Sequence, residues 1–147
     1  MTQANARSDS VHASCVAIDS DRGVLIMGAS GSGKSGLAHM MMSLGASLVA
    51  DDRTKLTSSP DGTALIASAP QSIQNLIEAR GIGILKAQTL PSCTICAVID
   101  LDHCEEERLP PRRIRRLIGH DIPEYRRSDE PHFAAALIQL LKGGRCA

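Results

Sequence analysis

The feature that most constrains this chain is an eight-residue segment, Gly28-Ala29-Ser30-Gly31-Ser32-Gly33-Lys34-Ser35, which fits the phosphate-binding pattern G-x-x-x-x-G-K-[ST] at every fixed position. Its glycines let successive backbone N–H groups point inward at phosphate oxygens, which Cβ atoms at those positions would obstruct. In loops of this kind the lysine reaches the β- and γ-phosphates and the serine ligates Mg²⁺. The segment therefore predicts nucleotide binding, with Lys34 on the phosphates and Ser35 on the metal.

The flanking sequence has the strand and the helix that such a loop requires. Residues 23–27 are a short apolar run, which predicts a strand. Residues 34–44 contain no proline and carry apolar side chains at helical spacing, namely Leu37, Ala38, Met41 and Leu44. Gly45 is a typical residue after a helix end, so the helix is expected to stop there.

Acidic residues follow the next strand of the pattern. Residues 46–50 read as a strand that ends in Asp51-Asp52, and residues 11–18 read as an earlier strand that turns through 19–23 into the 23–27 strand. In α/β sheets ligands collect beyond the carboxyl ends of strands, so the acidic pair is expected to face the γ-phosphate and its metal. The alternative is a solvated turn, where aspartate is also common.

Two further segments complete the central part of the chain. Residues 55–57 and 63–67 around the Ser58–Gly62 turn predict a β-hairpin that serves as scaffold. Residues 76–85 alternate, with Glu78 and Arg80 on one side just before two glycines. A carboxylate and a guanidinium held together near a phosphate site would supply a metal contact and neutralise transition-state charge.

Composition limits the class of protein. The chain has 147 residues with 16 basic and 16 acidic side chains, so no net charge draws it to nucleic acid or to an anionic membrane. One Phe, one Tyr and no Trp leave few platforms for base stacking along a single strand. No run approaches the length of a membrane span and the N-terminus has no secretory pattern, which predicts a cytoplasmic protein. We expect a flexible segment over residues 1–10 and one catalytic domain over 11–147.

The five cysteines form an odd set and are expected to be reduced thiols. Cys93-Thr94-Ile95-Cys96 has zinc-ligand spacing, with His103 and Cys104 close by. The pair lies in an apolar β-type run, 93–101, where residues three apart point to opposite faces and do not easily chelate one metal. Small buried side chains are therefore the favoured interpretation, with zinc as the alternative.

The last part of the chain is basic and then apolar. The cluster of Arg112, Arg113, Arg115 and Arg116 is more typical of a solvated helix face than of a phosphate or partner contact. A loop carrying Arg126-Arg127 is expected next, followed by a helix over 131–142. Its apolar stripe, Phe133, Leu137, Leu140 and Leu141, is expected to pack in the core.

Three motifs in order resemble the catalytic domain of bacterial HPr kinase/phosphorylase. They are the glycine-rich segment 28–35, the Leu-Val-Ala-Asp-Asp segment 48–52, and Ile-Glu-Ala-Arg-Gly-Ile-Gly-Ile at 77–84. The second and third are much more specific than the first, and the likeness runs from about His12 to Arg108. The chain resembles a short form of the family that has the catalytic domain without the N-terminal domain.

The resemblance implies a Mg²⁺-dependent enzyme that transfers the γ-phosphoryl group of ATP to a serine of the phosphocarrier protein HPr, or a paralogue, in regulation by the phosphotransferase system. It also implies phosphorolysis in reverse, a homo-oligomer that is a hexamer, and an α/β fold similar to phosphoenolpyruvate carboxykinase, with a mixed sheet and flanking helices. By position, His12 matches an active-site histidine, Asp52 the acid/base, and Arg108 a catalytic arginine. Lys34 matches the phosphate lysine, Ser35 and Glu78 the magnesium ligands, with Asp51 and Arg80 in support.

Two positions depart from the family pattern. Gly36 stands where the family commonly has glutamate directly after the loop serine, and no Pro-Gly-Arg-Asn segment, which the family uses for dephosphorylation, follows Leu109. These departures count against phosphorolysis. They also keep open a non-catalytic module that senses ATP. A second alternative is a small-molecule kinase, in which the Arg112 to Arg116 cluster would form an arginine-bearing lid.

Overall fold

The computed structural model describes residues 8–70 and 75–147 of the chain. Within them lie two helices, α1 (Lys34–Ser43) and α2 (Phe133–Gly143), and eleven strands. The strands are β1 (Ser8–Val11), β2 (Ala13–Asp19), β3 (Arg22–Met27), β4 (Ser47–Ala50), β5 (Thr54–Ser58), β6 (Leu65–Ser68), β7 (Leu76–Ala79), β8 (Gly83–Lys86), β9 (Ser92–Cys104), β10 (Arg113–Leu117) and β11 (His120–Arg127).

A mixed sheet of nine strands forms the body of this described part, in the order β1-β5-β6-β9-β3-β2-β4, with β11 also paired to β9 and β10 to β11. The central strand β3 is parallel to β9, and β11 is parallel to β9 on the opposite side of that strand. Strand β2 is antiparallel to both β3 and β4, so β4 runs in the same direction as β3. The carboxyl ends of β3, β4, β9 and β11 therefore meet at one edge of the sheet.

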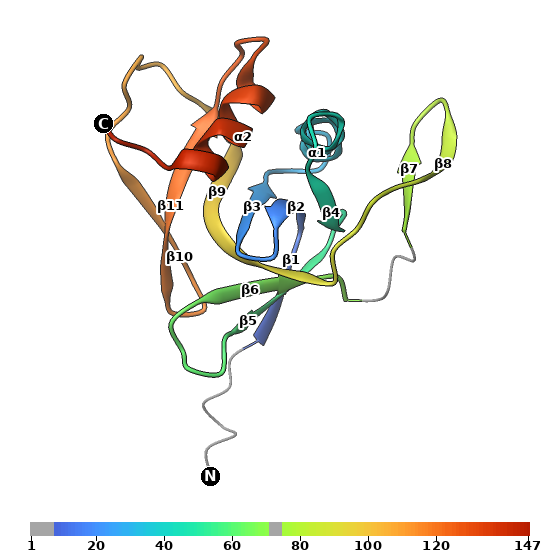
Figure 1. Ribbon diagram of the computed structural model, residues 1–147. Coiled ribbons are helices and arrows are strands. Elements are labelled where there is room, and N and C mark those ends of the chain that lie inside the picture. The colour runs from blue at the N-terminus through green and yellow to red at the C-terminus, as the bar shows by residue number, and fades with distance from the viewer. Residues whose placement is uncertain (1–7, 71–74) are drawn as a thin grey trace.

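Alternation along the central strands divides the apolar side chains between two cores. Val16, Val24 and Ile26 face the helices and pack with Leu37 and Met41 of α1 and with the buried side of α2. The intervening residues of the same strands, including Cys15 and Leu25, face the other way and pack with residues from β5, β6 and β11. Figure 1 shows α1 and α2 side by side on the first face, while β5 and β6 curve beneath the second.

The hairpin β7–β8 stands apart from the main sheet. It forms its own two-stranded sheet and projects to one side of the molecule (Figure 1). Ile77 is buried in the core beneath the helices, whereas Ile82 and Ile84 near the tip are exposed. The predicted segment 76–85 is thus a hairpin with its turn at Arg80–Ile82.

The basic cluster is not a helix face, and the arginine pair after it is not in a loop. Residues 113–117 form strand β10, and Arg126 and Arg127 close strand β11, to which β10 pairs. Opposite charges explain the strand pairing, because Arg115 meets Glu124 and Arg116 meets Asp121 across the ladder. Arg113 is paired with Glu105. Arg113, Arg115 and Arg116 therefore stabilise the β10–β11 hairpin through ion pairs. The charge pattern of the sequence did not reveal this role.

Cys93 and Cys96, the pair with zinc-ligand spacing, lie in two different environments. Cys93 is buried against Cys15, with 3.5 Å between the two sulfur atoms, whereas Cys96 is exposed. The hydrogen bond with Cys93, together with burial, raises the pKa of the Cys15 thiol well above its usual value. Both buried cysteines therefore act as small apolar side chains in the second core.

Residues 1–7, which include most of the expected flexible N-terminus, lie outside the described part of the chain. Ser8–Val11 form strand β1 on β5. Neither described helix is long and apolar enough to cross a bilayer.

Candidate active site

The edge where β3, β4 and β9 end carries most of the predicted site residues. The glycine-rich loop, residues 28–33, follows β3 and leads into α1. Asp51 and Asp52 follow β4, and His12 immediately precedes β2, whose first residue lies at the same edge because β2 is antiparallel to its neighbours. A ligand at this edge would meet all three segments.

The glycine-rich loop has the backbone conformation that its sequence predicts. Gly31 and Gly33 have φ angles of 84° and 106°, in the left-handed region that glycine adopts without strain. At Gly28 a Cβ atom would come within 2.5 Å of the Ser32 Oγ, so the loop closes on itself too tightly for a side chain there. The Ser32 Oγ is buried and has no hydrogen-bond partner among the described residues. The loop thus contains an unused donor at the amino end of α1, which favours an anion.

Lys34 turns back over this loop. Its side chain is buried, and its Nζ donates to the carbonyl oxygens of Gly28 and Ala29 at 2.8 and 3.0 Å. No carboxylate pairs with it among the described residues. A buried ammonium held only by neutral carbonyls has its charge uncompensated, and a phosphate oxygen on the loop would supply the missing anion.

Ser35 joins the loop to the acidic pair. Its Oγ donates to Asp51 Oδ1 at 2.9 Å. Asp51 Oδ1 also accepts a hydrogen bond from Ser14 Oγ at 2.9 Å. A serine hydroxyl and a carboxylate at the end of a parallel strand form an oxygen donor set of the kind that holds Mg²⁺ beside nucleotide phosphates.

His12 and Asp52 form a second pair. His12 Nε2 lies 2.7 Å from Asp52 Oδ1, and the two side chains are 42% and 76% exposed. Asp52 has a φ angle of 67°, which places its carboxylate on the opposite side from that of Asp51. The Ala13 N–H donates to the Asp52 carbonyl at 3.1 Å and fixes this conformation. The acidic pair is therefore divided, with Asp51 toward Ser35 and Asp52 toward His12 and solvent.

Ser14 is a site residue that the sequence did not reveal. It is completely buried in β2, and besides its bond to Asp51 its Oγ accepts from the Asp52 backbone N–H at 3.3 Å. One hydroxyl thus contacts both members of the acidic pair. The only sequence signal is a polar residue within the otherwise small and apolar Ala13–Ala17 run.

Asp102 was also not predicted. It lies near the end of β9, and its Oδ1 accepts a hydrogen bond from the Ala29 backbone N–H at 2.9 Å. Asp100, two residues earlier, is buried, which opposes its ionisation, but hydrogen bonds from His103 and the Asp102 N–H with nearby Arg115 hold its pKa below the usual value. β9 therefore holds the start of the glycine-rich loop through the Asp102 side chain.

The structure places Glu78 and Arg80 on the β7–β8 hairpin next to α1. The Glu78 carbonyl lies 3.3 Å from the Nε2 of His39, which is one helical turn beyond Ser35. The Glu78 and Arg80 side chains form no hydrogen bond or ion pair with each other or with other described residues, and the structure does not bring Glu78 into the Ser35–Asp51 contact. Their expected mutual contact is absent from the described part of the chain.

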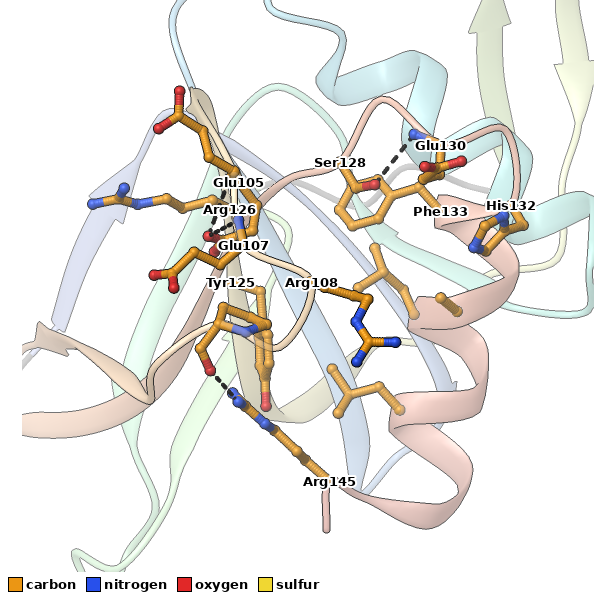
Figure 2. A pocket seen from close by; sticks show the side chains of 15 residues that line it. Glu105, Glu107, Arg108, Tyr125, Arg126, Ser128, Glu130, His132, Phe133 and Arg145 are labelled. Atoms are coloured by element: carbon orange, nitrogen blue, oxygen red, sulfur yellow. Dashed lines mark hydrogen bonds between the residues drawn. The ribbon is translucent and has the colours of Figure 1, made fainter. Parts of the chain in front are cut away.

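Arg108 is separate from the acidic pair. It lies in the loop after β9 and lines a pocket against α2, to which no residue of 28–35 contributes (Figure 2). Among the described residues no cluster of three or more His, Cys, Asp or Glu side chains is placed to hold a metal ion. A metal at Ser35 and Asp51 would depend on nucleotide phosphates for its remaining ligands, as Mg²⁺ commonly does.

The fold and this edge define a mixed α/β protein with a glycine-rich loop and a pair of carboxylates at one edge of the sheet. The model of the HPr Serine kinase C-terminal domain matches residues 3–107, and the chain belongs to that family. It is similar to the HPr kinase/phosphorylase of Geobacillus thermodenitrificans, with 42% identity over 93 residues that cover 58% of this chain and 30% of that protein. It is also similar to the Bordetella pertussis HPr kinase/phosphorylase, with 47% identity over 68 residues that cover 46% of this chain and 22% of that protein.

A solved structure supports the fold over nearly the whole chain. The Hpr(Ser) kinase/phosphatase from Coxiella burnetii aligns with a TM-score of 0.70 and 25% identity, covering 91% of this chain and 88% of that one. The matched segments of the curated relatives above cover under a third of their length. The resemblance to this family and the mixed sheet with flanking helices are thereby confirmed.

Proposed function

We propose that this protein is an ATP-dependent protein-serine kinase that phosphorylates the phosphocarrier protein HPr or a paralogue. The observation that carries the proposal is the arrangement of two pairs of side chains at one edge of the sheet. Ser35 and Asp51 lie at the glycine-rich loop, and Asp52 and His12 face solvent. Family membership supplies the substrate class.

The phosphate end of ATP would lie on residues 28–35. Lys34 would exchange its carbonyl partners for phosphate oxygens, and the Ser32 hydroxyl would donate to another. Ser35 and Asp51 fit a magnesium ion as oxygen ligands, and Glu78 would approach through water from the hairpin. When bound, Mg²⁺ neutralises charge on the phosphate oxygens.

Asp52 would accept the proton of the attacking serine. A serine hydroxyl is a weak nucleophile, and a carboxylate within hydrogen-bond reach takes its proton as the new P–O bond forms. The hydrogen bond from His12 orients the carboxylate through Oδ1 and leaves the other oxygen for the substrate. In reverse, the protonated acid would donate to the leaving serine oxygen, although Gly36 and the missing Pro-Gly-Arg-Asn segment count against efficient phosphorolysis.

The exposure of the His12–Asp52 pair favours a protein substrate. The Asp52 side chain is 76% exposed, and Asp52 does not line the pocket against α2. A serine on the surface of a folded carrier protein can reach such a group, whereas a small alcohol would need a pocket to hold it.

The test is phosphoserine formation on purified HPr and on its nitrogen-related paralogue, measured by mass spectrometry with Mg²⁺ and ATP. We expect transfer by the wild type and none by Lys34→Ala. Phosphorylation of a small alcohol instead would favour the small-molecule kinase. ATP binding without turnover would favour the sensing module. Light scattering during the same preparation tests the proposed hexamer.

A further inference from the structure

The loop that carries Arg108 is fixed to the fold at its start by Glu105. The Glu105 N–H donates to the Arg127 carbonyl at 2.7 Å, and the Glu105 carboxylate pairs with Arg113. The same carboxylate accepts the N–H groups of the next two residues, both at 3.2 Å. The loop is therefore held in one place directly after β9.

The rest of the loop, residues 106–112, has much less support. The structure describes all of these residues, and within it they have no regular secondary structure and make no backbone–backbone hydrogen bond. Most of them are exposed, and the Leu109 side chain next to Arg108 is 66% exposed. A segment of this kind takes many conformations unless another part of the chain holds it.

Pro110 is the point where the end of the chain contacts this loop. In the fully described range 106–112 it is the one partly buried residue, and its carbonyl accepts a hydrogen bond from the Arg145 guanidinium. Arg145 is likewise the one partly buried residue of 142–147, a range that is also described throughout. The contact thus joins two otherwise exposed segments, two positions away from Arg108.

The Arg145 guanidinium has a second contact, with Tyr125 of β11. Its central carbon lies 5.9 Å from the centre of the Tyr125 ring, within the range of a cation–π interaction. Tyr125 packs against the core beneath the helices. The Arg145 side chain therefore connects the loop to a strand of the sheet.

The way in which α2 ends brings Arg145 to the loop. The helix is anchored in the core by four buried residues, Ala134, Leu137, Ile138 and Leu141. Gly144 follows it with a φ angle of 76°, in the left-handed region, and donates its N–H to the Leu140 carbonyl at 2.8 Å. Figure 2 shows Arg145 extending from this turn toward the loop. A further hydrogen bond, from Arg112 to the Cys146 carbonyl at 3.5 Å, joins the same two segments.

Arg108 is a cation at the edge of the sheet that carries the candidate active site. Its side chain makes no hydrogen bond or ion pair with any described residue (Figure 2). It follows Asp102, which accepts the Ala29 N–H at the start of the glycine-rich loop, and the six intervening steps of chain span at most about 22 Å. A guanidinium at this edge can neutralise charge on a phosphoryl group during transfer, but only if its loop is held in place.

We propose that Arg145 is a positioning residue for phosphoryl transfer, which holds the loop at Pro110 and thereby keeps Arg108 at the edge of the sheet that binds the phosphates. The inference rests on the proposed function, because that function gives Arg108 a phosphoryl group to act on. Arg145 itself touches neither the nucleotide nor the attacking serine. Its effect reaches the reaction through Arg108.

Kinetics on the full chain with HPr, ATP and Mg²⁺ test this role. Arg145→Ala releases the loop at Pro110, so kcat for phosphoserine formation should fall about ten- to hundredfold, as expected for a misplaced group, while ATP affinity is retained. The matched control is Lys142→Ala, which removes an exposed positive charge from the same end of α2 and should leave kcat unchanged. A wild-type kcat in Arg145→Ala would contradict the proposal.

A double-mutant cycle separates positioning from direct action on the substrate. Arg108→Ala should lower kcat at least as much as Arg145→Ala does. Adding Arg145→Ala to Arg108→Ala should then cause no further loss, because both substitutions remove the same contribution. Losses that multiply would mean that Arg145 acts independently of Arg108. A fully active Arg108→Ala protein would mean that Arg108 has no part in transfer, and either result would overturn the assignment.

Limited digestion with trypsin measures the loop without any reaction. The Arg108–Leu109 bond lies in the exposed part of the loop, and its cleavage depends on how often the loop opens. Arg145→Ala should be cut at this bond several-fold faster than the wild type and Lys142→Ala, as followed by mass spectrometry. Equal cleavage rates would show that Arg145 does not hold the loop. A wild type that transfers no phosphate to HPr would overturn the proposed function and with it the role of Arg108, whereas the cleavage rates would still decide whether Arg145 holds the loop.

Discussion

Ser14 and Asp51 are joined by a partly buried hydrogen bond of 2.9 Å that links β2 to the end of β4 at the candidate active site. Ser35 donates to the same carboxylate oxygen from α1 at 2.9 Å. Asp51 is thus held from two sides, and its position relative to the glycine-rich loop is fixed before any ligand arrives. Such preorganisation lowers the cost of aligning a metal and phosphates.

Ser14→Ala should therefore impair transfer more than its effect on stability suggests. The substitution removes a buried donor to Asp51 and an acceptor for the Asp52 N–H, which should cost about 1–3 kcal/mol in the free energy of unfolding. We expect kcat for phosphoserine formation to fall and the Mg²⁺ requirement to rise, because Asp51 is no longer fixed. Denaturant unfolding and Mg²⁺-dependent kinetics measure the two effects separately.

The matched control is Thr54→Val. Thr54 is also completely buried, and its hydroxyl donates to the Ala13 carbonyl at 2.9 Å without contacting Asp51. A comparable loss of stability with normal kinetics is expected. If both variants show the same kinetic change, Ser14 acts only through stability.

Lys34→Ala should weaken or abolish ATP binding while the fold remains intact. The lysine makes no ion pair in the described structure, and its bonds to Gly28 and Ala29 carbonyls are replaceable by water. Its loss removes the positive charge that phosphates require, so affinity should fall by at least about tenfold. Calorimetry gives the affinity and circular dichroism the fold, with exposed Lys55→Ala as the control. Unchanged ATP affinity would mean that residues 28–35 do not bind phosphate.

Local patterns predicted most of the fold near the site. The strand before the glycine-rich loop, the helix after it and the strand that ends at Asp51 all depend on apolar periodicity and glycine positions close together in the sequence, and the structure has them as β3, α1 and β4. The last helix was predicted within two residues at its start for the same reason.

Long-range pairing explains what the sequence did not reveal. The arginines of 112–116 have no strong strand pattern of their own, and β10 forms by pairing with β11, where its side chains also meet acidic partners. Ser14 lies 37 positions from Asp51, and Asp102 lies 73 positions from Ala29, so no local pattern brings either pair together. No local pattern predicts the pocket that Arg108 lines either, because its residues come from three segments, the loop after β9, the end of β11 and α2.

Glu78→Gln tests the hairpin's contribution to metal binding. The carboxylate is exposed and unpaired in the described structure, so removing its charge should leave stability within about 0.5 kcal/mol of wild type. If it reaches the metal through water, the Mg²⁺ concentration for half-maximal transfer should rise. Lys86→Gln, an exposed charge change on the same hairpin, should leave this concentration unchanged. An equal Mg²⁺ dependence in Glu78→Gln and wild type would exclude Glu78 from the metal site.

Replacing Asp52 and Asp51 by asparagine should have two different effects, the first on the rate of transfer and the second on metal binding. Asp52 has a positive φ angle, and asparagine accepts that conformation more readily than most residues, so Asp52→Asn should keep the backbone and the size of the side chain. It removes the proton acceptor for the substrate serine, and such assistance typically contributes about 10²- to 10⁴-fold to the rate. Transfer to HPr should fall by that order while ATP affinity is retained.

Asp51→Asn should instead weaken the binding of Mg²⁺. Asp51 faces Ser35 rather than the solvent-exposed His12, so its loss should weaken ATP binding at limiting Mg²⁺, and excess Mg²⁺ should partly restore transfer. Phosphoserine formed per minute across a Mg²⁺ series, with ATP affinity measured alongside, distinguishes the two roles. Rescue of Asp52→Asn by Mg²⁺, or a larger and unrescued loss in Asp51→Asn, would reverse the assignment of acid/base and metal ligand.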